Sequence, residues 1–596
     1  MQTHSQPRRD TTGQSRPARP TRQSRSGGLT GLERRLLGWR IRFGGNRELS
    51  RFARSLLLFV AGVLLVGSSA MIDPVLHRGV ETGEDMPYTV QSTGRELAVN
   101  VDLTRFDTSQ IDSVLSTLQT NGFVYIRQPV SWATIEPTQG TFNWTMLDAV
   151  VNGANAHGLR LIVTIVDTPG WARRASELNY ADAPPSDPTG LAGFTTALAM
   201  RYQENLDFYQ FFDRPNVAER WGGATPSPTE YVELLAAAFG AVRNANTEAK
   251  ILLAELDPRG SSGVLGDDFA YIRSVYDVGG AAFFDIASFQ LDGGTRAPSD
   301  RSVSPDRPNL SRAILLRELM IDRGDEAKAI WATQYGWAAT DDLSNETVAD
   351  YLLEGIDRAR NEWPWMGPMF SWSLVSDAQT APFALLNSDG TAKPQFTALA
   401  SYGGSEASRV APTGFVPMLS SAVTYSGNWD DQHLNRQIFQ TTSETNASVT
   451  MTFQGTGVIA ILRESPDAGV LHATLDGKPL PSSFPVEDGA SVIDLEWTQA
   501  EDIQAALAEG LDDGEHVLTL TLASEGRVTI GGMIVTRRLP MVWPIMLLTL
   551  VGIILLIAAF RDLIYVIANR WGHFEIRGGA RRVTSWGQFS ERWSHR

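Results

Sequence analysis

Several acidic side chains lie near the ends of apolar segments that we predict to be strands. They are Asp167, Asp213, Glu255, Asp257 and Asp377. Two positioned carboxyl groups can act as a general acid and base, or as an acid and a nucleophile. Glu255 paired with Asp213 is the most plausible such combination. The simpler interpretation, which we favour, is that these acids form ion pairs with arginines such as Arg127 and Arg214, or face solvent.

Other common catalytic and cofactor signatures are missing from the sequence. The 596 residues include no cysteine, which excludes disulfide bridges, thiolate metal sites and thiol nucleophiles. The eight histidines are scattered, without an HExxH segment or a His–carboxylate cluster at metal-ligand spacing. No GxGxxG or GxxxxGK(S/T) segment opens a predicted helix, and no GxSxG segment occurs. We therefore predict no metal site and no cofactor.

The elements that would position these side chains alternate between short apolar runs and longer amphipathic stretches. The predicted strands are Leu97–Val101, Phe123–Arg127, Arg160–Val166, Asp207–Phe212, Lys250–Glu255, Phe284–Phe289, Ala329–Gln334 and Pro368–Trp372. Predicted helices between them include Ser109–Thr120, Thr229–Asn244 and Asn345–Arg360. This alternation predicts an α/β fold, a TIM (β/α)8 barrel, whose functional side chains follow the carboxyl ends of the strands. A doubly wound open sheet is the alternative, and the missing nucleotide-binding fingerprints count against it.

After Gly404 the pattern changes to short β-rich runs separated by turns. Predicted strands are Ser448–Gln454, Gly457–Leu462, His472–Leu475, His516–Leu522 and Arg527–Ile530. Asp476-Gly477 and Asp513-Gly514 are turn signals between such runs. This part of the chain is therefore expected to form a β-sandwich of roughly 130 residues.

Three motifs between residues 127 and 394 resemble one family in the right order. Residues 127–144 read R-x4-W-x3-EP-x2-G-x-F-x-W, residues 168–171 read TP-x-W, and residues 385–394 read LL-x2-DG-x2-KP. They resemble clan A (the 4/7 superfamily) of retaining glycoside hydrolases, particularly members associated with bacterial exopolysaccharides and cell-surface glycans. The resemblance implies the same barrel, with catalytic glutamates after strands four and seven.

Both catalytic positions of that clan are substituted in this chain. The Asn-Glu-Pro pattern is replaced by Asp213-Arg214-Pro215, and the Glu of the Thr-Glu-x-Gly-Trp pattern by Gln334. The clan's histidine near the end of strand six is also missing, since residues 288–291 read SFQL. Hydrolysis with retention needs two carboxyl groups about 5–5.5 Å apart. A guanidinium stays protonated and an amide is a poor nucleophile, so we expect inactivity unless Glu255 and Asp213 substitute.

The resemblance also implies a cleft that binds sugar. Trp132, Trp171, Trp337 and Trp372 lie where the related enzymes stack sugar rings, and core packing is the alternative for each. Arg127, Asp213, Arg214 and Gln334 complete the predicted substrate-binding set. The five donors of Arg214 could hold a uronate or another anionic substituent.

The second domain resembles the jelly-roll modules that are often appended to glycosidases. The shared features are FxGTGV at residues 453–458, LDG at 475–477 and DGEHxLxL at 513–520. Tyr425, Trp429 and Trp497 could stack sugars, although core packing is favoured for them. A spacer and a binding module remain equal alternatives for this domain.

The formal net charge of −16 is unevenly distributed. Residues 1–54 carry thirteen Arg against three acids, and residues 561–596 carry seven Arg against three acids, so the intervening residues carry about −30. Uncharged apolar runs at 55–72 and 541–560 are long enough to cross a bilayer. The basic flanks place both tails in the cytoplasm by the positive-inside rule. A cleaved signal peptide is the alternative for the first run, but about fifty residues precede it.

The predicted organisation has seven parts. A basic tail at 1–54, disordered at first and then lying on the inner membrane surface over residues 32–43, precedes a transmembrane helix at 55–72. A linker (73–94), the barrel (95–404), the sandwich (405–538), a second transmembrane helix (539–562) and a cytoplasmic tail (563–596) follow. The acidic middle argues against nucleic-acid binding, and a nucleic-acid-binding basic tail is the less favoured alternative.

Three functions are compatible with these features. The first is a membrane-anchored, non-catalytic protein that binds a surface or nascent polysaccharide and acts with glycan synthesis or export proteins. The second is an active glycosidase or transglycosidase with relocated carboxylates. The third is a structural protein of the cell envelope. We favour the first.

Overall fold

The computed structural model describes residues 47–83, 96–174, 176, 179–264, 266–377, 380–434, 437–538 and 543–574. The predicted tail at 1–46, including its membrane-surface segment, and residues 575–596 lie outside the described part of the chain. The chain divides into two units, one made of residues 1–75 and 541–596 and the other of residues 76–540.

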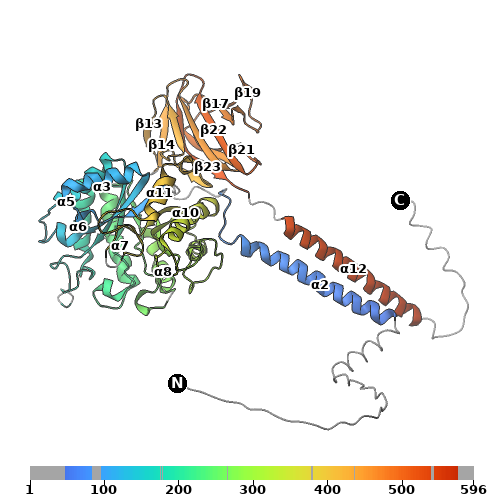
Figure 1. Cartoon of the computed structure of the whole chain (residues 1–596). Helices are drawn as coiled ribbons and strands as arrows, with labels where there is room; N and C mark the ends of the chain where they lie inside the picture. Colours follow the sequence, from blue (N-terminus) through green and yellow to red (C-terminus); the bar gives the residue numbers. More distant parts are fainter. Residues whose placement is uncertain are drawn as a thin grey trace, which may run out of the picture. The chain divides into compact units, whose positions relative to one another are not determined.

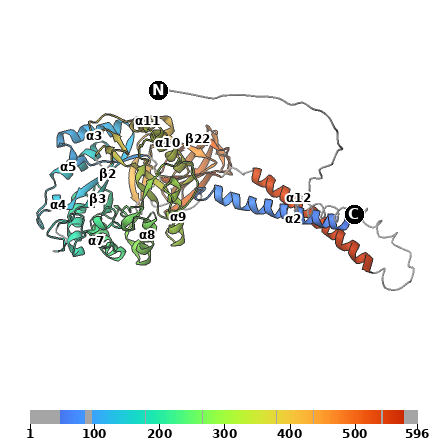
Figure 2. The ribbon, with the colours of Figure 1, turned by 60° about the horizontal axis from the view of Figure 1, so that its bottom comes forward.

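Eight parallel strands form the barrel in the order β5-β4-β3-β2-β1-β8-β7-β6, and helices surround them (Figure 2). They are β1 (Leu97–Asn100), β2 (Phe123–Ser131), β3 (Arg160–Val166), β4 (Phe208–Phe211), β5 (Lys250–Leu252), β6 (Ala287–Asp292), β7 (Ile330–Gly336) and β8 (Met366–Ser371). A parallel bridge between Leu252 and Ile286 joins the two end strands and closes the ring. The predicted (β/α)8 barrel is thus confirmed.

Two of the longest barrel helices begin at serines that cap them. The Ser227 side chain accepts a hydrogen bond from Glu230 N at the start of α7 (Pro228–Ala245), and Ser344 does the same from Thr347 N for α10 (Asn345–Glu362). The others around the barrel are α3 (Thr108–Thr120), α4 (Trp132–Ile135), α5 (Thr145–Ala156), α6 (Pro188–Tyr202), α8 (Asp267–Asp277), α9 (Ala313–Asp322) and α11 (Pro394–Gly403). Each longer helix turns an apolar face to the strands, as Val348, Leu352 and Ile356 do in α10.

Large aromatic side chains fill the barrel below the ends of the strands. Tyr125, Phe208, Trp331 and Phe370 contact one another, with ring centroids 5.1–6.4 Å apart. Two positions further along β2, β4 and β7 the side chains, Arg127, Gln210 and Thr333, are polar. The barrel therefore has an apolar plug and, above it, a polar layer that forms the floor of a cleft.

The residues after 410 form two antiparallel sheets that pack face to face (Figure 1). One has β13 (Asp430–Leu434), β14 (Gln437–Thr442), β23 (Val528–Thr536), β16 (Gly457–Glu464) and β21 (Glu501–Ala508), with β11 (Gly414–Val416) beside β23. The other has β12 (Val423–Ser426), β15 (Ser448–Gly455), β22 (Gly514–Leu522), β17 (Val470–Leu475), β20 (Ala490–Asp494) and β19 (Val486–Glu487), with β18 (Lys478–Pro479) beside β17. Alternating buried residues such as Val449, Met451 and Phe453 form the core between the sheets.

The first unit contains two long helices that run antiparallel, α2 (Arg47–Leu76) and α12 (Trp543–Phe574) (Figures 1 and 2). Gly62 and Gly552 let the backbones approach, since a Cβ on Gly62 would lie 2.9 Å from Gly552 O. Ser55 Oγ donates to Ala559 O at 2.7 Å. By length and composition, residues 50–71 and 545–568 could each cross a membrane.

Candidate ligand-binding cleft

A cleft of about 530 Å³ lies at the carboxyl ends of the barrel strands. Its charged and amide-bearing lining residues are Asn100, Asp102, Arg105, Arg127, Asp167, Asp182, Asp213, Arg220, Gln334 and Asp377. A second cavity of about 440 Å³ shares Asp102, Pro129, Val166 and Asp167 with it. The adjoining cavities give room for a ligand larger than a single sugar ring.

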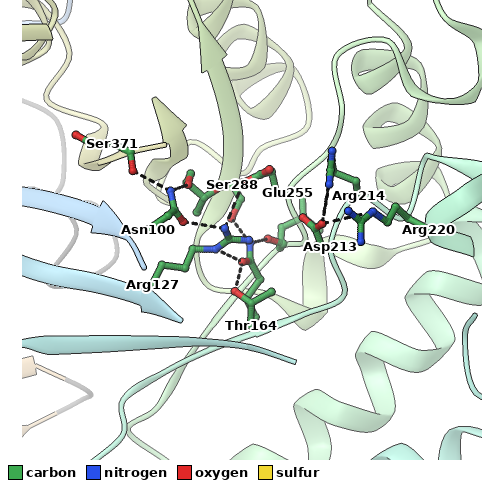
Figure 3. A network of polar contacts seen from close by, with 12 residues as sticks. Asn100, Arg127, Thr164, Asp213, Arg214, Arg220, Glu255, Ser288 and Ser371 are labelled. Carbon is green, nitrogen blue, oxygen red and sulfur yellow. Dashed lines mark hydrogen bonds and ion pairs between the residues drawn. The ribbon is translucent and has the colours of Figure 1, made fainter. Parts of the chain in front are cut away.

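The floor of the cleft is a hydrogen-bonded network centred on Arg127 at the middle of β2 (Figure 3). Arg127 Nε donates to Gln210 Oε1 at 2.8 Å, and its Nη1 donates to Asn100 Oδ1 at 2.9 Å. Gln210 Nε2 in turn donates to Ser288 Oγ at 3.0 Å and to Leu253 O at 2.8 Å. Four strands are thereby tied together through one buried guanidinium, which fixes the shape of the floor.

Glu255 lies behind this floor and is fully buried. Arg127 Nη1 is 3.7 Å from its Oε2, and neither carboxylate oxygen accepts a hydrogen bond of ordinary geometry from the described residues. Burial raises the pKa of Glu255 to about 7, against the attraction of Arg127. Glu255 is not among the residues that line the cleft, so a ligand there would not touch it.

Asp213 and Arg214, which follow β4, form an ion pair at the edge of the cleft (Figure 3). Arg214 Nη2 donates to Asp213 Oδ2 at 3.1 Å, and its Nη1 is 4.0 Å from Asp257 Oδ2. Burial opposes ionisation of Asp213, but the guanidiniums of Arg214, Arg127 and Arg220 hold the pKa of Asp213 below its usual value. Asp213 lines the cleft, whereas Arg214 is not among the described lining residues.

The backbone that carries these side chains is strained. Phe212 and Arg214, on either side of Asp213, have φ values of +69° and +50°, and Asp167 after β3 has +57°. Residues other than glycine rarely adopt this conformation, and it persists where surrounding contacts enforce it. The main-chain hydrogen bonds from Phe212 N to Ile165 O and from Arg214 N to Glu255 O do so here.

Gln334, which the sequence resemblance aligns with the clan's nucleophile, lies on β7. Ala332 pairs with Phe289 and Gln334 with Gln290, so β7 has one extra residue, Thr333, between these pairs. Gln334 lines the cleft, is 8% exposed, and its Oε1 accepts no hydrogen bond from the described residues. The site thus presents a free carbonyl oxygen where the reaction would need a carboxylate.

Of the four tryptophans predicted to stack sugars, Trp372 is the one that lines the cleft, where its ring centroid lies 3.9 Å from that of Phe383. Trp132 is buried against Trp171, and its Nε1 donates to Glu136 Oε2 at 2.7 Å. Trp337 is fully buried and donates from Nε1 to Arg296 O at 2.7 Å. The core-packing alternative therefore describes Trp132 and Trp337, and Trp171 is partly buried beside Trp132.

Sequence reasoning missed several lining residues: Asn100, Asp102, Arg105, Asp182 and Arg220. Asn100 ends β1, so applying the strand-end rule to the first strand would have found it. Asp182 and Arg220 come from the long loops after β3 and β4 and form an ion pair at 3.2 Å. No sequence pattern marks that pairing.

These features bear on the chemistry available to the site. Within the described ranges, no group of three or more His, Cys, Asp or Glu side chains could hold a metal ion. Arg214 and Gln334 are the residues that the sequence resemblance aligns with the clan's two catalytic carboxylates. The polar lining of the cleft is therefore suited to a polar ligand.

A comparison with protein families finds the Glyco_hydro_42 family, described as beta-galactosidase, over residues 104–177. This stretch runs from the loop after β1 to the loop after β3 and includes the first two of the three motifs. The eight-strand order and this match give the chain a glycoside hydrolase-like fold, which confirms the resemblance predicted from the sequence.

Solved structures of glycoside hydrolases are also similar to this chain. A family 39 glycoside hydrolase from Bacteroides cellulosilyticus WH2 is 17% identical over 72% of this chain and 81% of its own, with a TM-score of 0.43. The family 39 enzyme from Xanthomonas axonopodis pv. citri is 14% identical over 74% and 96%, with a TM-score of 0.40. A monomeric beta-xylosidase from Caulobacter crescentus CB15 is 13% identical over 75% and 98%, with a TM-score of 0.39. No curated protein matches the chain.

Proposed function

We propose that this protein is a membrane-anchored, glycoside hydrolase-like protein whose barrel binds a polysaccharide without cleaving it. The observation that carries the proposal is that the cleft is present while both expected catalytic carboxylates are replaced. The cleft keeps an aromatic wall at Trp372 and a polar floor, while Arg214 and Gln334 replace the two carboxylates. Such a protein would act as an accessory to the synthesis or export of a cell-surface polysaccharide.

One observation favours an active glycosidase with relocated carboxylates. The pKa of Glu255 is raised to about 7 while that of Asp213 is lowered, the kind of split that separates an acid from a nucleophile. Glu255 is, however, fully buried behind Arg127, and an acid must reach the glycosidic oxygen to protonate it. We therefore retain non-catalytic binding as the proposal. A structural envelope role without sugar binding is the remaining alternative.

Binding and turnover separate these three functions. The full-length protein in lipid nanodiscs would be tested against a panel of bacterial polysaccharides and oligosaccharides, with parallel assays for newly released reducing ends. We expect binding without turnover. Turnover abolished by Glu255→Gln would establish the relocated site, and failure to bind any glycan would leave the structural role.

We also propose that both termini lie in the cytoplasm and that the barrel and sandwich lie outside it. The basic residues at the outer ends of both apolar helices support this orientation. Arg54 and Asp562 lie 3.7 Å apart, so those ends meet at one side of the helix pair.

The absence of cysteine makes this orientation straightforward to test. Ser443→Cys, exposed on the sandwich, should react with a membrane-impermeant maleimide in intact cells or spheroplasts. Ser590→Cys in the carboxyl-terminal tail should react only after permeabilisation. The opposite labelling pattern would overturn the proposed topology.

A further inference from the structure

The arginine side chains that line the cleft are already paired. Each of its three arginines faces a carboxylate: Arg127 faces Glu255 at 3.7 Å, Arg220 faces Asp182 at 3.2 Å, and Arg105 faces Asp377 at 3.4 Å. Arg127 also donates to Gln210 and Asn100. A ligand carboxylate would therefore have to compete with a carboxylate of the protein for every arginine in the cleft.

The acceptors, by contrast, include free groups. Gln334 Oε1 is buried at the cleft and accepts no hydrogen bond from the described residues. Asp167 lines the same cleft, is partly exposed, and forms no ion pair with any other residue in the described part of the chain. These two acceptor groups would be satisfied by a ligand that supplies hydrogen-bond donors.

The charge of the lining also favours a ligand that carries hydrogen-bond donors and positive charge. Five aspartates line the cleft against three arginines. Burial raises the pKa of Asp182 despite the attraction of Arg220, and the nearby charges of Asp167 and Asp213 raise it further. The lining therefore has an excess of negative charge, and it is concentrated on the side formed by the loops after β3 and β4.

We propose that the cleft selects a glycan whose sugars carry a protonated amine, such as a de-N-acetylated hexosamine polymer. The ammonium would lie against Asp167, and a neighbouring hydroxyl would donate to Gln334 Oε1. The inference rests on the proposed glycan-binding function and gives it a substrate class. It also replaces the expectation that Arg214 holds a uronate, because Arg214 is paired with Asp213 and is absent from the described lining.

The test measures the affinity of the full-length protein in nanodiscs for three oligosaccharides of equal length. Titration calorimetry is carried out at pH 6 and low salt, with a chelator present. The probes are hexaglucosamine, its fully N-acetylated counterpart and hexagalacturonate. We expect hexaglucosamine to bind at least about tenfold more tightly than either of the others, and this preference to shrink with added salt. Equal binding of the acetylated hexamer, or tighter binding of the galacturonate, would overturn the inference.

Two variants and a control locate the effect. Asp167→Asn keeps a residue that tolerates positive φ and removes the charge, so it should abolish the preference by weakening hexaglucosamine binding far more than binding of the acetylated hexamer. Gln334→Met should weaken binding of both glucosamine-based hexamers to a similar degree. Asp322→Asn, exposed at the end of α9, should behave as the wild type. Preference unaffected by Asp167→Asn would contradict the placement of the ammonium.

The outcome also distinguishes this inference from the function on which it rests. Neutral glycans that bind as tightly as hexaglucosamine would refute the selection for an amine and leave glycan binding intact. Failure of all three hexamers and of the polysaccharide panel would refute both.

Discussion

The cleft end of the barrel and the β-sandwich differ in backbone strain and in whether their buried polar atoms form hydrogen bonds. At the cleft, Asp167, Phe212 and Arg214 adopt positive φ, and Glu255 and Gln334 keep buried oxygens without hydrogen bonds of ordinary geometry. In the sandwich, the described positive-φ residues other than glycine are Asn446, Asp476 and Asp488, which lie in turns where such residues are common. Strands such as β15 alternate regularly between buried and partly exposed residues.

This difference indicates where function is concentrated. Strain and unsatisfied polar groups destabilise a fold, and they persist mainly where a ligand or a reaction has selected them. The contact of the sandwich with the barrel includes a hydrogen bond from Arg537 Nη1 to Asn361 Oδ1 at 2.6 Å. We therefore interpret the barrel as the binding domain and the sandwich as its support.

The largest expected effect concerns a tryptophan that the sequence marked as a sugar platform. Trp337→Ala should lower the free energy of unfolding by about 3–5 kcal/mol, because it empties a fully buried site against Tyr335 and Tyr351. The matched variant is Trp497→Ala in the sandwich, 54% exposed, which should change it by less than about 0.5 kcal/mol. Denaturant unfolding measures both. Similar values for the two would mean that Trp337 is not a core residue.

The next largest effect is on glycan affinity, which should depend on the barrel and not on the sandwich. Trp372→Ala removes the larger of the two aromatic side chains described in the cleft lining and should weaken glycan binding about 10- to 100-fold, with a smaller effect on stability than Trp337→Ala. Trp429→Ala, in the sandwich beside Tyr425, is the matched change and should leave affinity unaltered. A loss of affinity in Trp429→Ala alone would make the sandwich the binding module and the barrel its support.

The buried acid predicts a pH dependence that belongs to the barrel. Because the pKa of Glu255 is raised from 4.5 to about 7 in the folded protein, its neutral form stabilises the fold fully below about pH 4.5, and this stabilisation is lost as pH rises through 7. Between pH 5 and 8, the wild type should lose about 1–3 kcal/mol more unfolding free energy than Glu255→Gln.

All other titrating groups are shared, so the difference between the two pH profiles isolates Glu255. The control Glu354→Gln, exposed on α10, should follow the wild-type profile. Parallel profiles for the wild type and Glu255→Gln would show that the carboxyl is not held neutral by burial.

Much of the fold could be predicted because parallel barrel strands are continuous apolar runs. Arg160–Val166 was predicted residue for residue and Ser448–Gln454 to within one residue. The predicted Lys250–Glu255 extends beyond β5, which ends at Leu252, although a single bridge between Asp213 and Glu255 continues the pairing. The apolar run shows which residues are buried, but it does not show at which residue the hydrogen bonds to the neighbouring strand end.

The site was less predictable, for reasons that individual residues illustrate. Asp213 and Gln334 follow from their places at strand ends, and both line the cleft. Trp132 and Trp337 also follow strand ends but turn into the core, since the strand-end rule gives a residue's position and not the direction of its side chain. Asp182 and Arg220 meet only through tertiary packing of two loops, so the sequence holds no signal for them.

The central claim is that the cleft binds a glycan and does not cleave it. The most direct measurement follows binding and release of reducing ends in one sample of the full-length wild-type protein, with the best-binding glycan of the panel. The account predicts saturable binding, weakened by Trp372→Ala, with no release above that of a protein-free control. Release that saturates with the same affinity and disappears in Glu255→Gln would contradict it.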